Sequence, residues 1–119
     1  MKAQLKWMDS PDVDLDAFQP DDPADVDFLL QAGIGPEGSD AADIFDLRVC
    51  TPEWLRRQID ADGAPAFAFG TSMLIVKAFD PALIRGALQH YCERCVGTTW
   101  EEIVPKLSRV AAWEYDGYR

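Results

Sequence analysis

Apolar residues occupy every second position in two neighbouring stretches of the sequence, and this alternation constrains the fold more than any other feature. The first stretch, FLLQAGI, is followed by the turn-forming segment GPEGSD, and the second stretch, FDLRV, begins a few residues later. Period-two alternation is typical of a strand with one buried face, and short connections join antiparallel strands. The two apolar rows are Phe28, Leu30, Ala32 and Ile34, and Phe45, Leu47 and Val49. We therefore expect the two rows to lie side by side over a core.

Three further segments are predicted to be strands. AQLKWM alternates, so that Leu5 and Trp7 should share one face with Lys6 on the other. With the two strands described above, it would complete an antiparallel meander. SMLIVKAF, residues 72–79, is apolar enough for a central strand, and WEYDGY, residues 113–118, alternates like a short final strand.

A first helix is predicted to begin after the second apolar row. Thr51 is a favourable N-cap residue, and Pro52 suits the first helical position. Residues 60–70, DADGAPAFAFG, should form a flexible connection after this helix. The apolar stripe of the helix consists of Trp54, Leu55 and Ile59.

Two more helices are predicted in the last third of the chain. Asp80 and Pro81 should start the second helix, and Gly97 should end it. Thr99 and Glu102 have the spacing of a capping box for the third helix. The apolar face of the second helix is Leu83, Ile84, Ala87, Leu88, Tyr91, Cys92 and Cys95. The third helix should continue through Ile103, Leu107 and Val110, with a kink at Pro105.

These elements predict an α+β fold: an antiparallel sheet of about five strands with about three helices packed on one side. The 119 residues suit one domain, residues 1–119, with a core of useful size. The N-terminal segment lacks the apolar stretch of a secretory signal, and no apolar run reaches the roughly 20 residues of a membrane span. With only three cysteines, the sequence is consistent with a reducing cytoplasm.

The charge of the chain is concentrated in its first part. Residues 1–47 contain twelve acidic residues and two lysines, whereas residues 48–119 contain nine acidic and nine basic residues. The whole net charge of −10 therefore belongs to the first segment. Such a segment would repel nucleic acid and anionic membranes, and it would attract a basic protein surface.

The segment HYCERC suggests a zinc half-site or a redox dithiol, because two cysteines with C-x-x-C spacing follow a histidine. On a helix, however, Cys92 and Cys95 fall on the apolar face, whereas His90 lies about 200° from Cys92. Only Cys50 remains as a further thiol, although a structural zinc site requires four ligands. The pair also sits at a helix C-terminus, where the helix dipole disfavours a thiolate. We therefore expect the cysteines to pack in the core, with no bound metal or cofactor.

Other motifs do not define a reaction centre. PDVDLDAF has the D-x-D-x-D spacing of a calcium loop, but Ala17 and Pro23 occupy the positions where an EF-hand needs glycine and glutamate. A solvated acidic loop is the expected state, and weak cation binding remains an alternative. GIGPEG lacks the lysine of a phosphate loop, and a single histidine leaves little scope for triad catalysis. No catalytic residues are predicted.

Several longer segments follow one another along nearly the whole chain. They are K-A-x-L-K-x-x-x-S-P-D-x-D-L-D, F-L-L-Q-A-x-I-G-P-x-G and F-D-L-x-V-C-T-P-E-W-L in the first half, and L-I-V, Y-C-E-x-C-x-G-x-T-W-E-E and W-E-Y in the second. Together these segments resemble the immunity protein 8 family of bacterial polymorphic toxin systems. The resemblance implies a small α+β domain that is not an enzyme. It would protect the producing cell by binding a cognate toxin domain.

The resemblance also gives the acidic segment a possible role. Toxins of such systems often act on nucleic acids through basic clefts, and an acidic surface could mimic the phosphate backbone and speed association. The candidate toxin-binding residues are Asp12, Asp14, Asp16, Asp21, Asp22, Asp25, Glu37 and Asp40. The alternative is that these carboxylates only keep the protein soluble. A small redox or metal protein and a generic interaction module also remain open as rival functions, and the oligomeric state is not predicted.

Overall fold

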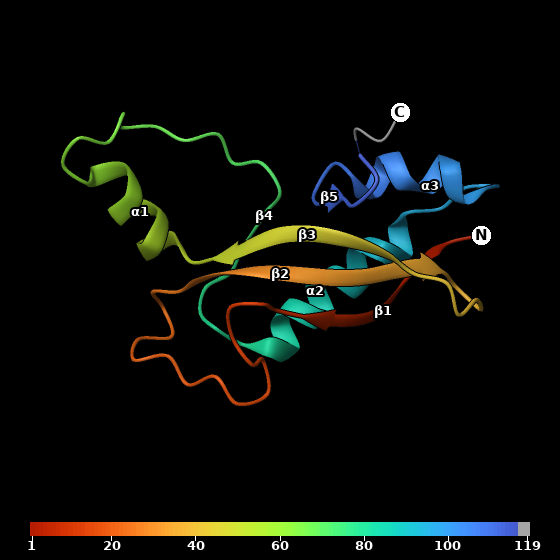
Figure 1. The fold of residues 1–119 in the computed structure, drawn as a ribbon, viewed down its shortest axis with the longest axis horizontal. Helices are drawn as coiled ribbons and strands as arrows, with labels where there is room; N and C mark the ends of the chain where they lie inside the picture. Colours follow the sequence, from red (N-terminus) through yellow and green to blue (C-terminus); the bar gives the residue numbers. More distant parts are fainter. Residues whose placement is uncertain (117–119) are drawn as a thin grey trace.

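The computed structural model describes residues 1–116 of the chain (Figure 1). The elements in chain order are β1 (Ala3–Asp9), β2 (Asp27–Pro36), β3 (Asp43–Cys50), α1 (Pro52–Asp60), β4 (Met73–Ile75), α2 (Pro81–Arg94), α3 (Trp100–Leu107) and β5 (Ala112–Trp113). The α+β class is as predicted. No helix in this part of the chain is long and apolar enough to cross a membrane.

The sheet is mixed but mostly antiparallel. β1, β2 and β3 form the predicted antiparallel meander, and the outer edge of β3 is shared by two short strands. β5 pairs antiparallel with Phe45 and Asp46, whereas β4 pairs parallel with the last three residues of β3. The prediction of a central strand over residues 72–79 is therefore wrong. β4 has three residues and lies at the edge of the sheet with one partner strand, and its Ile75 is 53% exposed.

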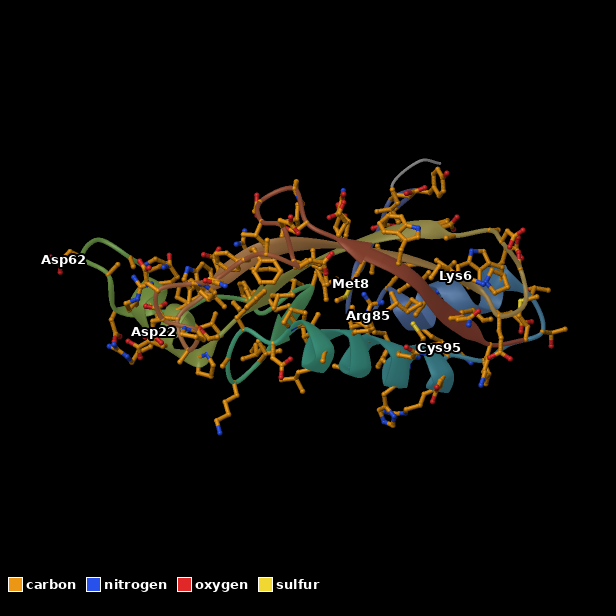
Figure 2. The ribbon with its side chains drawn as sticks, turned by 90° about the horizontal axis from the view of Figure 1, so that it is seen from below. Lys6, Met8, Asp22, Asp62, Arg85 and Cys95 are labelled. Atoms are coloured by element: carbon orange, nitrogen blue, oxygen red, sulfur yellow. The ribbon has the colours of Figure 1, made fainter. Side chains whose placement is uncertain are left out.

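The core lies between one face of the sheet and the helices α2 and α3. Both predicted apolar rows, on β2 and β3, are buried on this face. The helices contribute Ile84, Leu88 and Cys92 from α2, and Ile103, Val104 and Leu107 from α3. Figure 2 shows α2 running beneath the strands, with the opposite face of the sheet left without a helix over it. Burial on one face only is the arrangement that the alternating pattern predicts.

The orientation of Trp7 differs from the prediction. A β-bulge in β1 shifts the register, so that Leu5 pairs with Ile34 but Trp7 pairs with Gly33. The extra residue moves Trp7 to the open face, where it is 40% exposed, and Met8 packs against the core instead. Gly33 makes this possible, because a Cβ atom there would lie 2.2 Å from the indole ring of Trp7.

Thr51 occupies the N-cap position of α1 but does not cap it with its side chain. Its hydroxyl oxygen instead accepts a hydrogen bond from the amide of Val26 at 3.1 Å, and its own amide donates to the carbonyl of Val26 at 3.1 Å. Thr51 is fully buried. The predicted N-cap position is therefore confirmed, but the Thr51 side chain joins the end of β3 to the residue preceding β2 instead of capping the helix.

The C-terminal elements follow the predictions more closely. The hydroxyl of Thr99 accepts a hydrogen bond from the amide of Glu102, as expected for the N-cap of α3. The helix ends at Leu107, so Val110 lies beyond it. β5 covers only the start of the predicted final strand, and residues 117–118 of that prediction lie outside the described residues.

The half-buried carboxylate of Asp43 connects α3 and β5 to the start of β3. Both indole nitrogens, of Trp100 in α3 and Trp113 in β5, donate to the same Oδ2 atom of Asp43 at 2.9 Å. Glu114 adds a pair of bonds to Ile44, through its amide and its Oε2 atom. The start of β3 therefore fixes the positions of α3 and β5.

The molecule is elongated, because one segment extends beyond the sheet. The radius of gyration is 15.3 Å, compared with about 13.5 Å expected for a compact chain of this length. Helix α1 and residues 61–72 project from the end of β3 (Figure 1), and α1 has no fully buried residue. We call this segment, residues 52–72, the arm.

Candidate functional site

The eight candidate carboxylates lie at two opposite ends of the sheet. Six of them belong to the loop of residues 10–26, which connects β1 to β2, and the other two, Glu37 and Asp40, belong to the turn between β2 and β3. The ten residues of β2 separate the two groups. At about 3.3 Å per residue, this strand is about 30 Å long. The structure therefore does not bring all eight carboxylates into one site.

Four carboxylates gather around a pocket of about 470 Å³ at the end of the sheet where β2 begins. We call it the acidic pocket, and its lining is Phe18, Gln19, Pro20, Asp21, Asp22, Asp25, Val26 and Asp27. Three of its four carboxylates were predicted from the sequence. Asp27 was missed, because the sequence marked it only as the polar residue that precedes an apolar strand.

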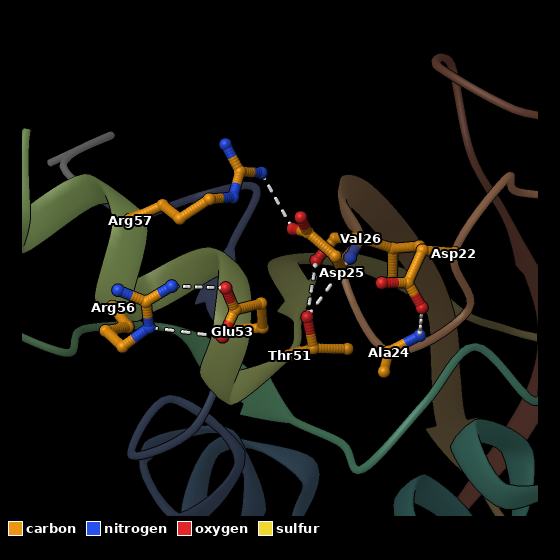
Figure 3. A network of polar contacts seen from close by, with 8 residues as sticks. All are labelled: Asp22, Ala24, Asp25, Val26, Thr51, Glu53, Arg56 and Arg57. Atoms are coloured by element: carbon orange, nitrogen blue, oxygen red, sulfur yellow. Dashed lines mark hydrogen bonds and ion pairs between the residues drawn. The ribbon is translucent and has the colours of Figure 1, made fainter.

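Two of the four pocket carboxylates are already neutralised by arginines. Asp25 forms an ion pair of 2.7 Å with Arg57 of α1, and Asp27 forms an ion pair with Arg48 of β3. Among residues 1–116, no cation forms an ion pair with Asp21 or Asp22. Figure 3 shows the Arg57–Asp25 pair, and it shows Asp22 turned toward the amide of Ala24, which donates to it at 3.0 Å. The unpaired negative charge of the pocket therefore resides on Asp21 and Asp22.

The D-x-D-x-D carboxylates stabilise their own loop. Asp12 accepts a 2.8 Å hydrogen bond from the amide of Leu29 in β2, and Asp14 accepts one of 3.0 Å from the amide of Asp16. All three carboxylates are exposed. In the part of the chain that the structure describes, no three or more His, Cys, Asp or Glu side chains come together as a metal site would require.

At the opposite end of the sheet, Glu37 forms an ion pair of 3.2 Å with Lys2, and Asp40 is exposed. An open pocket of about 590 Å³ lies beside this pair, and its lining includes Glu102. Because Lys2 compensates Glu37, this end carries a less concentrated negative charge than the acidic pocket does.

The three cysteines are buried and form no disulfide. Cys92 and Cys95 pack in the core beneath the sheet, as predicted, whereas His90 is exposed on the other side of α2. Burial raises the pKa of the Cys92 thiol to about 12, and it also raises the pKa values of Cys50 and Cys95. A reactive thiol has a lowered pKa. The environment of the pair therefore opposes redox chemistry.

The burial of Cys92 predicts a specific pH dependence of stability. As the pH rises above about 9, the unfolded thiol loses its proton while the native thiol, with a pKa of about 12, retains it. The native state then binds more protons than the unfolded state, so stability should decrease between pH 9 and pH 12. Urea unfolding at several pH values should show this decrease. The Cys92→Ala variant should be less stable at pH 7, but its stability should decrease less between pH 9 and pH 12. An equally steep decrease in stability for this variant would contradict the prediction.

The sequence interpretation also missed two exposed aromatic residues in the arm. Phe67 and Phe69 are 61% and 83% exposed, although residues 60–70 were predicted only to be a flexible connection. The available signal was composition, since two phenylalanines stand in a segment otherwise made of small and polar residues. Without periodicity, that signal does not show whether the rings are buried.

The chain resembles a described protein family over nearly its whole length. Neither the comparison with curated proteins nor that with solved structures found a significant match. The family model described as Immunity protein 8 matches residues 3–118, which is nearly the whole chain. The chain therefore belongs to the Immunity protein 8 family and is an immunity protein of toxin systems.

Proposed function

We propose that this immunity protein neutralises a cognate toxin domain by stoichiometric binding in the cytoplasm and without catalysis. The observation that carries the proposal is the family match over residues 3–118. An inhibitor of this kind needs a rigid scaffold and a complementary surface, and it does not need a reaction centre. The helix-backed sheet supplies such a scaffold.

The acidic pocket supports a more specific form of the proposal, in which the toxin presents a basic surface. Asp21 and Asp22 carry unpaired charge, while Asp25 and Asp27 form ion pairs with Arg57 and Arg48. Charged surfaces of opposite sign raise association rates by about 10- to 10³-fold at low ionic strength. A basic cleft of a nuclease-like toxin is the type of partner that would be attracted here.

Growth of cells that express the toxin-like C-terminal domain encoded beside this gene tests the proposal. Coexpression of the immunity protein should restore growth, and the two proteins should co-purify in a 1:1 complex. A toxic neighbouring domain that is neither rescued nor bound would refute the proposed function. Rescue by substoichiometric amounts of the immunity protein would instead indicate an enzymatic activity.

A further inference from the structure

The most exposed aromatic side chains of the described residues lie together in the arm. The rings of Phe67 and Phe69 contact each other edge to face, with centroids 6.0 Å apart. At 61% and 83% exposure, both rings remain largely in water. Large aromatic rings in water are unfavourable in a monomer, and aromatic residues are enriched at the centres of protein interfaces.

The backbone around these rings adopts an unfavourable conformation. Ala66, directly before Phe67, has φ of 67°, and Ser72 has φ of 49°. They are the only non-glycine residues with positive φ among residues 1–116, and both lie in the arm. Such conformations cost free energy and persist where structure or function requires them. The loop is thus bent in a way that its own residue types do not favour.

The arm is attached to the acidic pocket by specific contacts. Arg57 of α1 pairs with Asp25 of the pocket at 2.7 Å. At the base of the arm, the guanidinium of Arg48 lies 5.4 Å from the centre of the Trp54 ring, and Arg48 also pairs with Asp27 of the pocket. Figure 2 shows Asp22 and Asp62 at the same end of the molecule, away from Lys6 and Cys95. The arm that carries the exposed rings is therefore joined at its base to the acidic pocket.

We propose that Phe67 and Phe69 form the apolar anchor of the toxin-binding surface, with Asp21 and Asp22 as its acidic rim. This inference rests on the proposed function. The partner is a toxin domain with an apolar recess bordered by lysine or arginine residues. Aromatic anchors surrounded by polar groups are the usual anatomy of binding hot spots. In this arrangement the carboxylates set the association rate, and the two rings set the dissociation rate.

The test uses the neighbouring toxin-like domain as the probe and a double variant, Phe67→Ala with Phe69→Ala. Dissociation from the immobilised domain should become about 30-fold faster or more, the effect of losing a hot-spot residue. Leu83→Ala is the matched control, because Leu83 is an apolar residue of α2 that is 46% exposed. Its dissociation rate should equal that of the unchanged protein. The urea midpoints of both variants should stay unchanged, since the replaced side chains are exposed.

Each alternative outcome has a distinct meaning. If the unchanged protein binds and rescues while the double variant dissociates within about threefold of it, the anchor is elsewhere and only this inference fails. Equal acceleration in the Leu83→Ala control would also overturn it, because the effect would not be specific to the arm. If the unchanged protein neither binds nor rescues, the proposed function fails and this inference fails with it.

Discussion

Replacing Asp21 and Asp22 together by lysine should slow association with the toxin domain by about 10-fold or more at low ionic strength. These two carboxylates carry the unpaired charge of the acidic pocket, so their reversal should change the local field most. The dependence of the association rate on salt should also become weaker, because screening acts on the charges that steer the encounter. Stopped-flow or biosensor measurements from about 20 to 500 mM salt would resolve both effects.

The other end of the sheet supplies a matched control for charge. The variant with Glu37→Lys and Asp40→Lys changes the net charge by the same amount, but about 30 Å away along β2. We expect a clearly smaller loss of association rate from it. Equal losses would show that only net charge matters, and a larger loss would place the binding surface at the opposite end. Asp25 is left unchanged in both variants because its loss would release Arg57 and disturb the arm.

The variant Gly35→Ala should destabilise the fold by about 3 kcal/mol, a large effect for one methyl group. A Cβ atom at Gly35 would lie 1.8 Å from the carbonyl oxygen of Ala41 and 2.8 Å from its carbonyl carbon. These are backbone atoms of the turn that follows β2, and they cannot move as the end of a side chain can. The turn is further held by the hydrogen bond from Lys6 to the carbonyl of Ser39. Urea unfolding should show a lower midpoint with an unchanged slope.

Gly86→Ala is the control for this prediction and should have the opposite sign. Gly86 lies in the interior of α2, and a Cβ atom there would meet nothing within 4 Å. Alanine favours a helix over glycine by about 0.5–1 kcal/mol, so this variant should be more stable. A Gly35→Ala variant as stable as the unchanged protein would show that the turn can shift without cost, which would contradict the packing described here.

The candidate site could be predicted only in part, for a physical reason. Asp21, Asp22 and Asp25 were identified because the sequence shows where negative charge is concentrated. Which of them remains unpaired depends on arginines far away in the chain. Arg57 reaches Asp25 across 32 positions, and no local pattern encodes that contact. The sequence likewise did not show that Phe67 is exposed, because burial depends on which elements pack around a residue.

The sequence by itself determined the features that depend on near neighbours. Alternation placed the apolar rows of β2 and β3, and the helical spacing placed Cys92 on the buried face of α2. Proline and capping residues marked where α2 and α3 begin. These signals are local because strand and helix periods relate residues two to four positions apart.

The tertiary structure decided the features that depend on distant partners. Trp7 faces outward because Gly33, 26 positions away, leaves room for its ring after the bulge. The hydroxyl of Thr51 bonds to Val26 instead of capping α1, and β4 lies at the sheet edge because it reaches only the end of β3. The separation of the carboxylates into two ends follows from the length of β2 between them. Each outcome depends on which surfaces meet after the chain folds, and residue spacing alone does not specify this.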